Sequence, residues 1–484
     1  MLPAVAALVT VPMMIFGLGV EGFGIVTLVG SVIGYFGILD INLNAGAIKY
    51  LAEHNASGDR KRFAETFWFG AFFYGGLGLV GATLIYFCAS LLTGKFFDVS
   101  PELRDDTVLA FQIAALGFAL SQAQSYLITV PQALQRYDKS AQSEAFFGIL
   151  VNVASAAAAL AGAGIAGVIA VRVAISFLNV LYLLYLIQQF SLGLAFCWPR
   201  KDVRAALTSF SAYAYLSKLA STLHQHGDKL VIGALAGPVA VTFYSVPVTL
   251  ASRILGMTYR LSSVIYPRAS ALAASARIDE LRPIYLGSIR YVTYINLVAL
   301  GIVVLAGDEF LRRWVGEEFV AAGYPILVLM MLANLVDSMT NVPSLVNDAL
   351  GFPKVTGKFA LAKGLIGVGL VYLGTLYAGI TGAAIAHLAA SLLLGALFLW
   401  FVHGRTVPIT LGSTMKEGFG RSLLVGLLVF SVLLPAKWLF PAGVMTTLAI
   451  TAMACLFLAF AGFAFVVSVD DRAALLAMAR RFKS

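Results

Sequence analysis

The sequence predicts an all-α polytopic membrane protein. Of its 484 residues, 60% are hydrophobic and 12% are charged, and the mean hydropathy is +0.89. Soluble domains carry about 25% charged residues, so a soluble globule is excluded. Long segments such as Gly164 to Phe190 are almost continuously apolar. They lack the alternation of apolar and polar residues that a transmembrane β-barrel requires.

Apolar runs between polar breaks predict about fourteen transmembrane helices, because a helix needs about 20 apolar residues to cross a bilayer. The predicted helices are Met1 to Leu18, Phe23 to Tyr50, Phe67 to Leu92, Val108 to Thr129, Phe146 to Ala163, Ile165 to Phe190, Leu207 to His226, Val241 to Tyr266, Ile289 to Ala306, Tyr324 to Val346, Phe359 to Ala378, Ile380 to His403, Leu423 to Phe440 and Val444 to Val467. The chain opens directly into an apolar run, so we expect no cleaved leader.

Lys and Arg concentrate in alternate loops between these helices. One set of loops, with the two chain ends, holds 23 of them, and the opposite set holds 6. Cytoplasmic loops carry the excess of Lys and Arg, so we expect both termini in the cytoplasm and the protein in the inner (cytoplasmic) membrane. The net charge of +9 then reflects topology, and we expect no nucleic-acid partner.

Two segments recur along the chain and predict a repeat. VPQALQRYDKSAQ begins at Val130 and VPSLVNDALGFPK at Val342, while GIAGVIAVRV begins at Gly164 and GITGAAIAHL at Gly379. Six predicted helices separate the copies, so the halves would be related by an axis along the membrane normal and would enclose a central cavity. The expected organisation is an N-terminal six-helix lobe (1–190), a cytoplasmic linker (191–206), a C-terminal six-helix lobe (207–403), an extra helix pair (404–467) and a cytoplasmic amphipathic tail (468–484).

Six charged residues fall inside the predicted spans. The cations are Arg172, Lys218, Arg253 and Arg260, and the acids are Asp40 and Asp337. A charge at membrane depth costs at least about 2.5 kcal/mol unless it faces protein or a water-filled cavity. Cations outnumber acids, which favours an anionic cargo. We therefore expect the four cations to bind substrate in the cavity.

Each of these residues also has a structural interpretation. Arg260 near the cytoplasmic boundary could snorkel to the headgroups, and so could Arg172 near the outer surface. Lys218 and Arg253, closest to the bilayer midplane, could instead form ion pairs with the two acids. Asp40 could be a protonatable coupling residue, a partner of a cation, or a structural acid that holds neighbouring asparagines. Asp337 has the same open choice between coupling and structure.

No cofactor, metal or catalytic site is expected. The three cysteines lie far apart in apolar runs, and His224 and His226 have no third ligand nearby in the sequence, so neither a disulfide framework nor a zinc site is predicted. GxGxxG matches at Gly76 and Gly162 follow no strand, and tight helix packing explains them better than nucleotide binding. We therefore expect no enzyme activity.

Several motifs, taken in order, resemble the polysaccharide transporters of the MOP superfamily, called Wzx-type flippases, which are related to the lipid II flippase and MATE exporters. They are LGVEGFGIVTL from Leu18, YFGILDINLNAGAIKYLAEHNASGD from Tyr35, HGDKLVIGALAGPVAVTFYSVPVTL from His226, YPRASAL from Tyr266, RWVGEEFVAAGYPILVLM from Arg313 and ALGFPKVTGK from Ala349. One departure is Asn42, which occupies a position where the family usually has glycine. It argues against unwinding of the helix after Asp40.

The resemblance implies two lobes that rock between inward-open and outward-open states. The cargo would be an oligosaccharide on undecaprenyl diphosphate, and the partners would be this lipid-linked glycan, membrane lipid, and a polysaccharide polymerase or export machinery. Three alternatives stay open. They are a MATE-like exporter of cations or drugs, a membrane glycosyltransferase or ligase, and a non-transporting subunit of an export complex.

Overall fold

The computed structural model of the chain describes all residues except 1, 41, 191, 193, 264, 276, 440–442, 469–470 and 474–484. The described residues form helices, turns and short connections, without a strand. The prediction of an all-α protein is therefore confirmed. The predicted amphipathic tail (468–484) lies outside the described residues apart from Ser468 and residues 471–473.

The chain divides into two compact units, Met1–Ser245 and Val246–Ser484. The helices of the first unit, in chain order, are α1 (Leu2–Phe36), η1 (Gly37–Leu39), α2 (Leu43–Ala56), α3 (Arg60–Leu91), η2 (Leu92–Phe96), η3 (Pro101–Leu103), α4 (Arg104–Leu127), α5 (Thr129–Ala133), α6 (Tyr137–Leu160), α7 (Gly164–Gln189) and the larger part of α8 (Lys201–Ser262). Helix α8 begins inside the predicted linker (191–206), so the last residues of that segment are helical.

The second unit contains the end of α8 and the remaining helices. These are α9 (Ile265–Ala274), η4 (Ile278–Glu280), α10 (Leu281–Trp314), α11 (Glu318–Ala349), α12 (Pro353–Arg405), α13 (Leu411–Ser413), η5 (Thr414–Gly420), α14 (Arg421–Leu439), α15 (Val444–Ala461) and η6 (Gly462–Val466). The boundary between the units, at residues 245 and 246, falls within α8.

Among the described residues, ten helices are long and apolar enough to cross a membrane. Three of the long helices are interrupted, at Gly19 (φ 72°, ψ 172°) in α1, Gly237 (φ 77°, ψ 177°) in α8 and Gly379 (φ 58°, ψ −147°) in α12. A side-chain carbon on Gly374 would lie 2.3 Å from the carbonyl oxygen of Gly382. Eight residues of straight helix span about 12 Å, so α12 folds back on itself at Gly379.

Positive φ at these glycines explains why the chain can turn there, since residues with a side chain rarely adopt this conformation. Gly19 and Gly237 precede the second and eighth predicted helices and have nearly the same backbone angles, as expected if the two halves are built alike. The number of fourteen spans and the repeat itself stay predictions.

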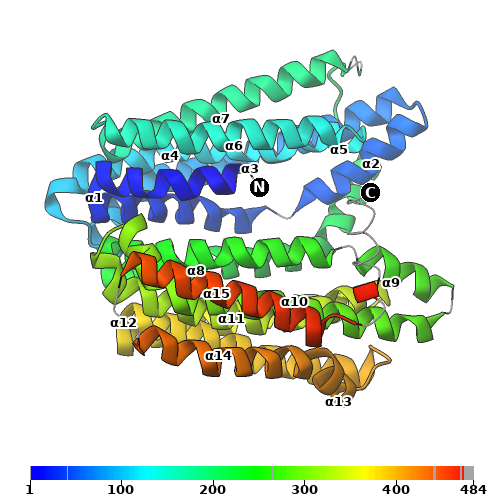
Figure 1. The fold of residues 1–484 in the computed structure, drawn as a ribbon. Helices are drawn as coiled ribbons and strands as arrows, with labels where there is room; N and C mark the ends of the chain where they lie inside the picture. Colours follow the sequence, from blue (N-terminus) through cyan, green and yellow to red (C-terminus); the bar gives the residue numbers. More distant parts are fainter. Residues whose placement is uncertain are drawn as a thin grey trace, which may run out of the picture. The chain divides into compact units, whose positions relative to one another are not determined.

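Helices of the first unit pack in a continuous bundle. Helix α3 packs on α4, α4 on α7, and α1 on both α6 and α7, as Figure 1 shows. A buried cluster around Phe63, Phe67, Tyr74 and Tyr126 joins α3 to α4 and the short helices α2 and α5. This cluster supports one wall of the site described below.

The part of α1 that follows Gly19 also approaches the part of α8 that follows Gly237. Gly24 has no space for a side chain, because its Cβ would lie 2.0 Å from the carbonyl oxygen of Pro238. Beside it, the Thr242 hydroxyl donates to the carbonyl oxygen of Val20 at 2.7 Å. Small residues allow helix backbones to meet in this way in membranes.

Large apolar side chains are exposed along the outer helices of both units. Phe87 on α3 is 78% exposed and Leu428 on α14 is 68% exposed. Exposing so many large apolar side chains to water would be unfavourable, whereas contact with lipid accommodates them. Together with the apolar helices, it identifies a multi-pass membrane protein.

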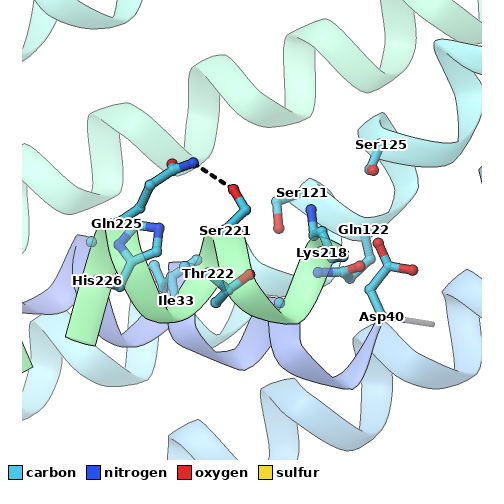
Figure 2. Close-up of a pocket in the computed structure, with 13 residues that line it drawn as sticks. Ile33, Asp40, Ser121, Gln122, Ser125, Lys218, Ser221, Thr222, Gln225 and His226 are labelled. Carbon is cyan, nitrogen blue, oxygen red and sulfur yellow. Dashed lines mark hydrogen bonds between the residues drawn. The ribbon is translucent and has the colours of Figure 1, made fainter. Parts of the chain in front are cut away.

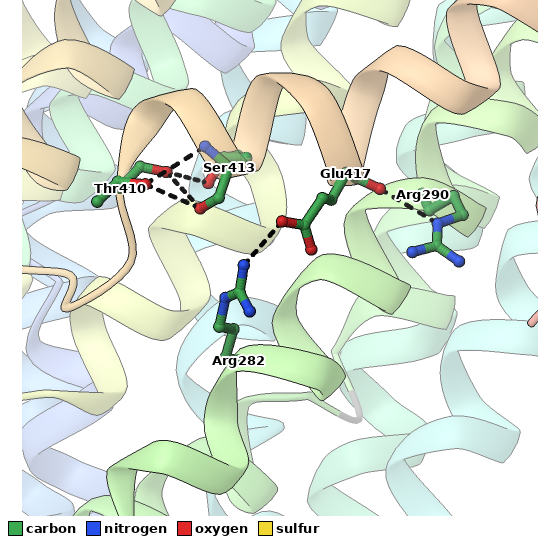
Figure 3. Close-up of polar contacts among 6 residues, drawn as sticks. Arg282, Arg290, Thr410, Ser413 and Glu417 are labelled. Atoms are coloured by element: carbon green, nitrogen blue, oxygen red, sulfur yellow. Dashed lines mark hydrogen bonds and ion pairs between the residues drawn. The ribbon is translucent and has the colours of Figure 1, made fainter.

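In the second unit, α10 packs on α11, and α11 on α12, while α14 and α15 pack on α10. Figure 3 shows how η5 is attached to α10. The Arg282 guanidinium donates to the Glu417 carboxylate at 2.8 Å, and Arg290 donates to the carbonyl oxygen of Glu417 at 3.3 Å. These contacts fix the connection into the extra helix pair against the bundle.

Candidate functional site

A polar pocket of about 360 Å³ lies inside the first unit, between α1, α4 and α8. Its lining residues are Gly30, Ile33, Gly34 and Gly37 from α1 and η1, Asp40 after η1, Ser121, Gln122 and Ser125 from α4, and Lys218, Ser221, Thr222, Gln225 and His226 from α8. Figure 2 shows Lys218, Gln122 and Asp40 as neighbours at one end, and His226 and Gln225 at the other. The pocket therefore contains two of the six charged residues predicted from the sequence.

The helix that carries Asp40 is broken. Instead of one helix over Phe23 to Tyr50, the structure has α1, the short turn η1 and α2, with Asn42 in the left-handed conformation (φ 57°). The prediction of one continuous helix is thus wrong, and Asn42 does not prevent unwinding after Asp40. Asparagine tolerates the left-handed conformation better than other residues with a side chain, so it can replace glycine here.

Hydrogen bonds from three elements hold this break. The Asp40 Oδ1 atom accepts the Asn42 N–H at 2.9 Å and the Tyr74 hydroxyl at 2.8 Å. The same Tyr74 oxygen accepts the N–H of Asn44 at 3.2 Å, in the first turn of α2. The Tyr215 hydroxyl of α8 donates to the carbonyl oxygen of Ile38 at 3.0 Å. Asp40 is buried, and its Oδ1 atom fixes the backbone where it leaves η1.

The Asp40 Oδ2 atom has no hydrogen bond to any residue that the structure describes. Asp40 itself lines the pocket. The sequence left three roles open for Asp40: a protonatable coupling residue, the partner of a cation, and a structural acid. The hydrogen bonds of Oδ1 correspond to the structural role, whereas Oδ2 remains available to a ligand.

Of the described lysines and arginines, Lys218 is the one that lines this pocket. It lies 17 residues after the start of α8 at Lys201 and 19 residues before the break at Gly237. At about 1.5 Å per residue, it is more than 25 Å from either end of this helical segment. Within the described part of the chain, its ammonium group makes no hydrogen bond or ion pair. Its charge is therefore available to a ligand.

Hydroxyl and amide side chains supply the rest of the polar lining. Those of Ser121, Gln122 and Ser125 come from successive turns of α4, and Ser125 accepts a hydrogen bond from the Asn44 amide at 2.8 Å. On α8, the Gln225 amide donates to the Ser221 hydroxyl at 2.8 Å, as Figure 2 shows. The sequence analysis missed these residues, although SQAQS from Ser121, inside an apolar run, was a detectable signal.

Close contact between α1 and α8 shapes the other end of the pocket. A Cβ on Gly34 would lie 2.3 Å from the imidazole ring of His226, so glycine at this position makes room for the ring. His226, to which the sequence analysis gave no role beyond excluding a zinc site, lines the pocket.

Arg172 does not line this pocket. Its Nε atom donates to the Ser155 hydroxyl at 3.0 Å, and its Nη2 atom lies 3.8 Å from the Met14 sulfur. It therefore packs in the seam between α1, α6 and α7. A role for Arg172 in substrate binding stays a prediction.

Arg253 and Arg260 belong to the second unit, at the end of α8, and both side chains are exposed. They are seven residues apart and so share a face of the helix. Their assignment as cargo ligands also stays a prediction.

Asp337 pairs with Lys363, and the two side chains are 8% and 23% exposed. Lys363 lies in the first turns of the predicted helix Phe359 to Ala378 and was therefore counted with the preceding basic loop. In the structure it lies ten residues beyond the start of α12 at Pro353, which is about 15 Å along the helix. Asp337 thus has a cation partner from α12 within its own unit. The predicted pairing of this acid with Lys218 or Arg253 overlooked Lys363.

Comparisons with known proteins agree on family and fold. A family model described as polysaccharide biosynthesis protein matches residues 1–273. A curated protein of Shigella flexneri named "Putative O-antigen transporter" is 25% identical over 363 residues, which cover 73% of this chain and 84% of that protein.

Two solved structures share the fold, each with a TM-score of 0.67 and 14% identity. One is an inward-facing multidrug resistance MATE transporter of the MOP superfamily, with 82% of this chain and 93% of that chain covered. The other is the lipid II flippase MurJ in an inward closed conformation, with 93% and 97% covered. These relatives are named as transporters or flippases and not as enzymes.

Proposed function

The chain belongs to the polysaccharide biosynthesis protein family, and we propose that it is a flippase that moves a lipid-linked oligosaccharide across the cytoplasmic membrane. The cargo would be an oligosaccharide on undecaprenyl diphosphate. The observation that carries the proposal is the Lys218 ammonium group, which lies in a polar pocket with no protein partner among the described residues.

The pocket offers groups for both parts of such a cargo. Lysine binds phosphate as a point charge, so Lys218 suits a phosphate oxygen of the diphosphate. Hydroxyl and amide side chains both donate and accept hydrogen bonds, as sugar hydroxyls do, and the pocket has six of them on α4 and α8. The free Asp40 Oδ2 atom can accept from a sugar hydroxyl.

The fold supports transport by alternating access. The chain has two compact units, and it shares its fold with a MATE transporter in an inward-facing conformation and with MurJ in an inward closed conformation. Sequence identity to these structures is 14%, so the likeness concerns the fold and not the cargo.

The membrane potential can drive this transport. A diphosphate carries about two negative charges, and each one gains roughly 2.3 kcal/mol per 100 mV on leaving an inside-negative compartment. Export of the cargo is therefore favourable without a coupling ion.

Reconstitution of the purified protein tests the proposal. Proteoliposomes with a fluorescent undecaprenyl-diphosphate oligosaccharide are treated with a membrane-impermeant quencher, and the protected fraction reports translocation. We expect wild type to translocate the cargo, Lys218→Ala to lose most of this activity, and Lys229→Ala to retain it. Lys229 is a matched control, since it is a lysine on the same helix that does not line the pocket. Equal activity in Lys218→Ala and wild type would reject the pocket as the cargo site.

Export of cations, as in MATE transporters, is the competing function, and Asp40 is the group in the pocket that favours it. The same proteoliposomes loaded with a lipophilic cationic dye distinguish the two. Dye export that requires Asp40, without movement of the lipid-linked glycan, would support a cation exporter.

Orientation is tested separately. Reporter fusions after Lys61, Arg282 and Lys358 should be cytoplasmic, and those after Lys95, Gly237 and Arg313 periplasmic, because the basic loops are expected inside. One inverted pair would contradict the proposed topology with cytoplasmic termini.

A further inference from the structure

Helix α3 is longer than a bilayer is thick, and its exposed residues show where lipid contact begins. The large apolar side chains exposed on α3 start at Phe72 and end at Leu91. These positions are about 28 Å apart along the helix, close to the thickness of the hydrocarbon core of about 30 Å. Trp68 lies about 34 Å from Leu91, and Arg60 about 46 Å from it. Trp68 and Phe72 therefore fall at the boundary between hydrocarbon and headgroups.

A connection between α7 and α8 packs on α3 at this same level. Its described residues, 192 and 194–200, form no regular secondary structure. Phe196 contacts Trp68 edge-on with ring centroids 5.2 Å apart, and Trp198 contacts Phe72 at 5.5 Å. Phe196 is nevertheless 66% exposed and Trp198 is 70% exposed. We call these four rings with residues 194–200 the aromatic strap.

Polar contacts fix the strap to α3 at both ends. The Trp68 indole N–H donates to the carbonyl oxygen of Ala195 at 3.2 Å. Arg200 donates to the Glu65 carboxylate at 3.1 Å, and the Glu65 side chain is only 2% exposed. The hydrogen bond from Arg200 to Glu65 raises the pKa of this guanidinium, so Arg200 stays charged. The exposed rings are thus held on α3 by the Trp68 hydrogen bond and by the ion pair of Arg200 with the buried Glu65 carboxylate.

Cations surround the strap on the side away from the hydrocarbon level. Arg60, Lys61 and Lys201 are exposed, and among the described residues none of their three side chains makes an ion pair or hydrogen bond. Burial raises the pKa of the Cys197 thiol, while the charge of Lys61 lowers it.

We propose that the aromatic strap is an interfacial anchor that binds anionic phospholipid headgroups, with its rings at the hydrocarbon boundary and Arg60, Lys61 and Lys201 at the phosphates. Trp at the interface places an apolar ring in the lipid and a polar N–H toward the headgroups. Each cation near an anionic surface adds about 1 kcal/mol of attraction, which corresponds to about fivefold in affinity. This binding is independent of the cargo pocket.

The levels of the residues along α3 favour a lipid partner over a protein one. The exposed rings lie at the end of a lipid-facing helix surface that is continuous from Phe72 to Leu91. Arg60 and Lys61 lie about 16 to 18 Å beyond Phe72 along α3, which matches the order of hydrocarbon, headgroup and water across a leaflet. A surface that binds another protein does not require apolar rings and cations to be arranged in this order along the helix.

Fluorescence quenching by brominated lipids tests the anchor in the full chain. The protein is reconstituted in mixtures of phosphatidylcholine and phosphatidylglycerol in which one lipid carries bromine. The fluorescence of Trp198 is obtained by subtracting the spectrum of Trp198→Phe from that of wild type. This subtraction cancels the contribution of the other four tryptophans, which both proteins contain. We expect stronger quenching by brominated phosphatidylglycerol than by brominated phosphatidylcholine, and stronger quenching by bromine near the headgroup than deep in the chain.

Charge variants then test the headgroup assignment. Lys61→Gln and Lys201→Gln should each lower the preference for phosphatidylglycerol by up to about fivefold. Lys416→Gln is a matched control, since Lys416 is an exposed cation of the second unit far along the chain, and it should leave the preference unchanged.

Quenching of Trp198 by aqueous iodide but not by brominated lipid would overturn the proposal. So would lipid quenching without headgroup preference, or protection from both quenchers, which would indicate a protein partner. Loss of flipping by Lys218→Ala leaves the anchor untouched, so the two proposals fail independently.

Discussion

Tyr74 holds the helix break at the cargo pocket, and Tyr74→Phe isolates its hydroxyl. This group donates to the Asp40 carboxylate at 2.8 Å and accepts the N–H of Asn44 at 3.2 Å, and Tyr74 is 1% exposed. A hydrogen bond to a charged group contributes about 1.5 to 3 kcal/mol, and leaving the partly buried Asn44 N–H unpaired adds a further penalty. We expect Tyr74→Phe to lower the free energy of unfolding by about 3 kcal/mol.

Tyr126→Phe is the matched control. Tyr126 is also fully buried and stacks on Tyr74 with ring centroids 5.4 Å apart, but its hydroxyl donates to the backbone carbonyl of Phe67 at 2.7 Å. A hydrogen bond between neutral groups contributes about 0.5 to 1.5 kcal/mol. The control variant should therefore lose about a third as much stability.

Two measurements distinguish the variants. Unfolding of the purified protein by increasing SDS in mixed micelles gives the change in stability, and hydrogen exchange gives its location. In Tyr74→Phe the amides of α2 (Leu43–Ala56) should exchange faster than in wild type, because local opening becomes easier when the break loses its clamp. Equal stability loss in both variants, or unchanged exchange in α2, would refute the role assigned to the Asp40–Tyr74 contact.

Two further predictions concern packing and charge. Gly24→Ala should lower the free energy of unfolding by about 1 to 3 kcal/mol, because the new Cβ would lie 2.0 Å from the Pro238 carbonyl oxygen. Gly75 has open space around it, so Gly75→Ala is the control. In the same SDS titration it should be neutral or stabilising by up to about 1 kcal/mol. Lys363→Met should lower stability by about 3 kcal/mol by removing the cation of a buried pair, and addition of Asp337→Asn should restore most of it. Full stability of Lys363→Met alone would contradict the importance of this pair.

Hydropathy was sufficient to predict an all-α membrane protein, because apolar composition and the 20-residue span follow directly from bilayer thickness. The cost of burying a charge was also sufficient to single out Lys218 and Asp40 before their shared pocket was known. The same argument misplaced Lys363, since a lysine near a helix end is counted as a loop residue although its helix extends further.

Features that depend on neighbouring helices could not be found in this way. In the sequence, Asn42 looks like an ordinary helical residue. Its left-handed conformation accompanies three hydrogen bonds around the break, in which Asp40 accepts the Asn42 N–H and the Tyr74 hydroxyl, and Tyr215 donates to the backbone of this segment. These side chains come from three separate segments of the chain. Ser121 and Gln122 belong to the polar run SQAQS, which the sequence shows, but uncharged polar residues in a transmembrane helix do not by themselves indicate a pocket. Only the packing of α1, α4 and α8 shows that they face a pocket.

The most direct test of the account compares two cargoes in proteoliposomes that contain wild type, Lys218→Ala or Lys218→Arg. One cargo is an oligosaccharide on undecaprenyl diphosphate, and the other is the same oligosaccharide on a polyprenol without phosphate. Wild type should translocate the diphosphate cargo faster, Lys218→Ala should lose this preference, and Lys218→Arg should keep part of it because the positive charge remains. An undiminished preference for the diphosphate cargo in Lys218→Ala would contradict the claim that Lys218 binds the anionic part of the cargo.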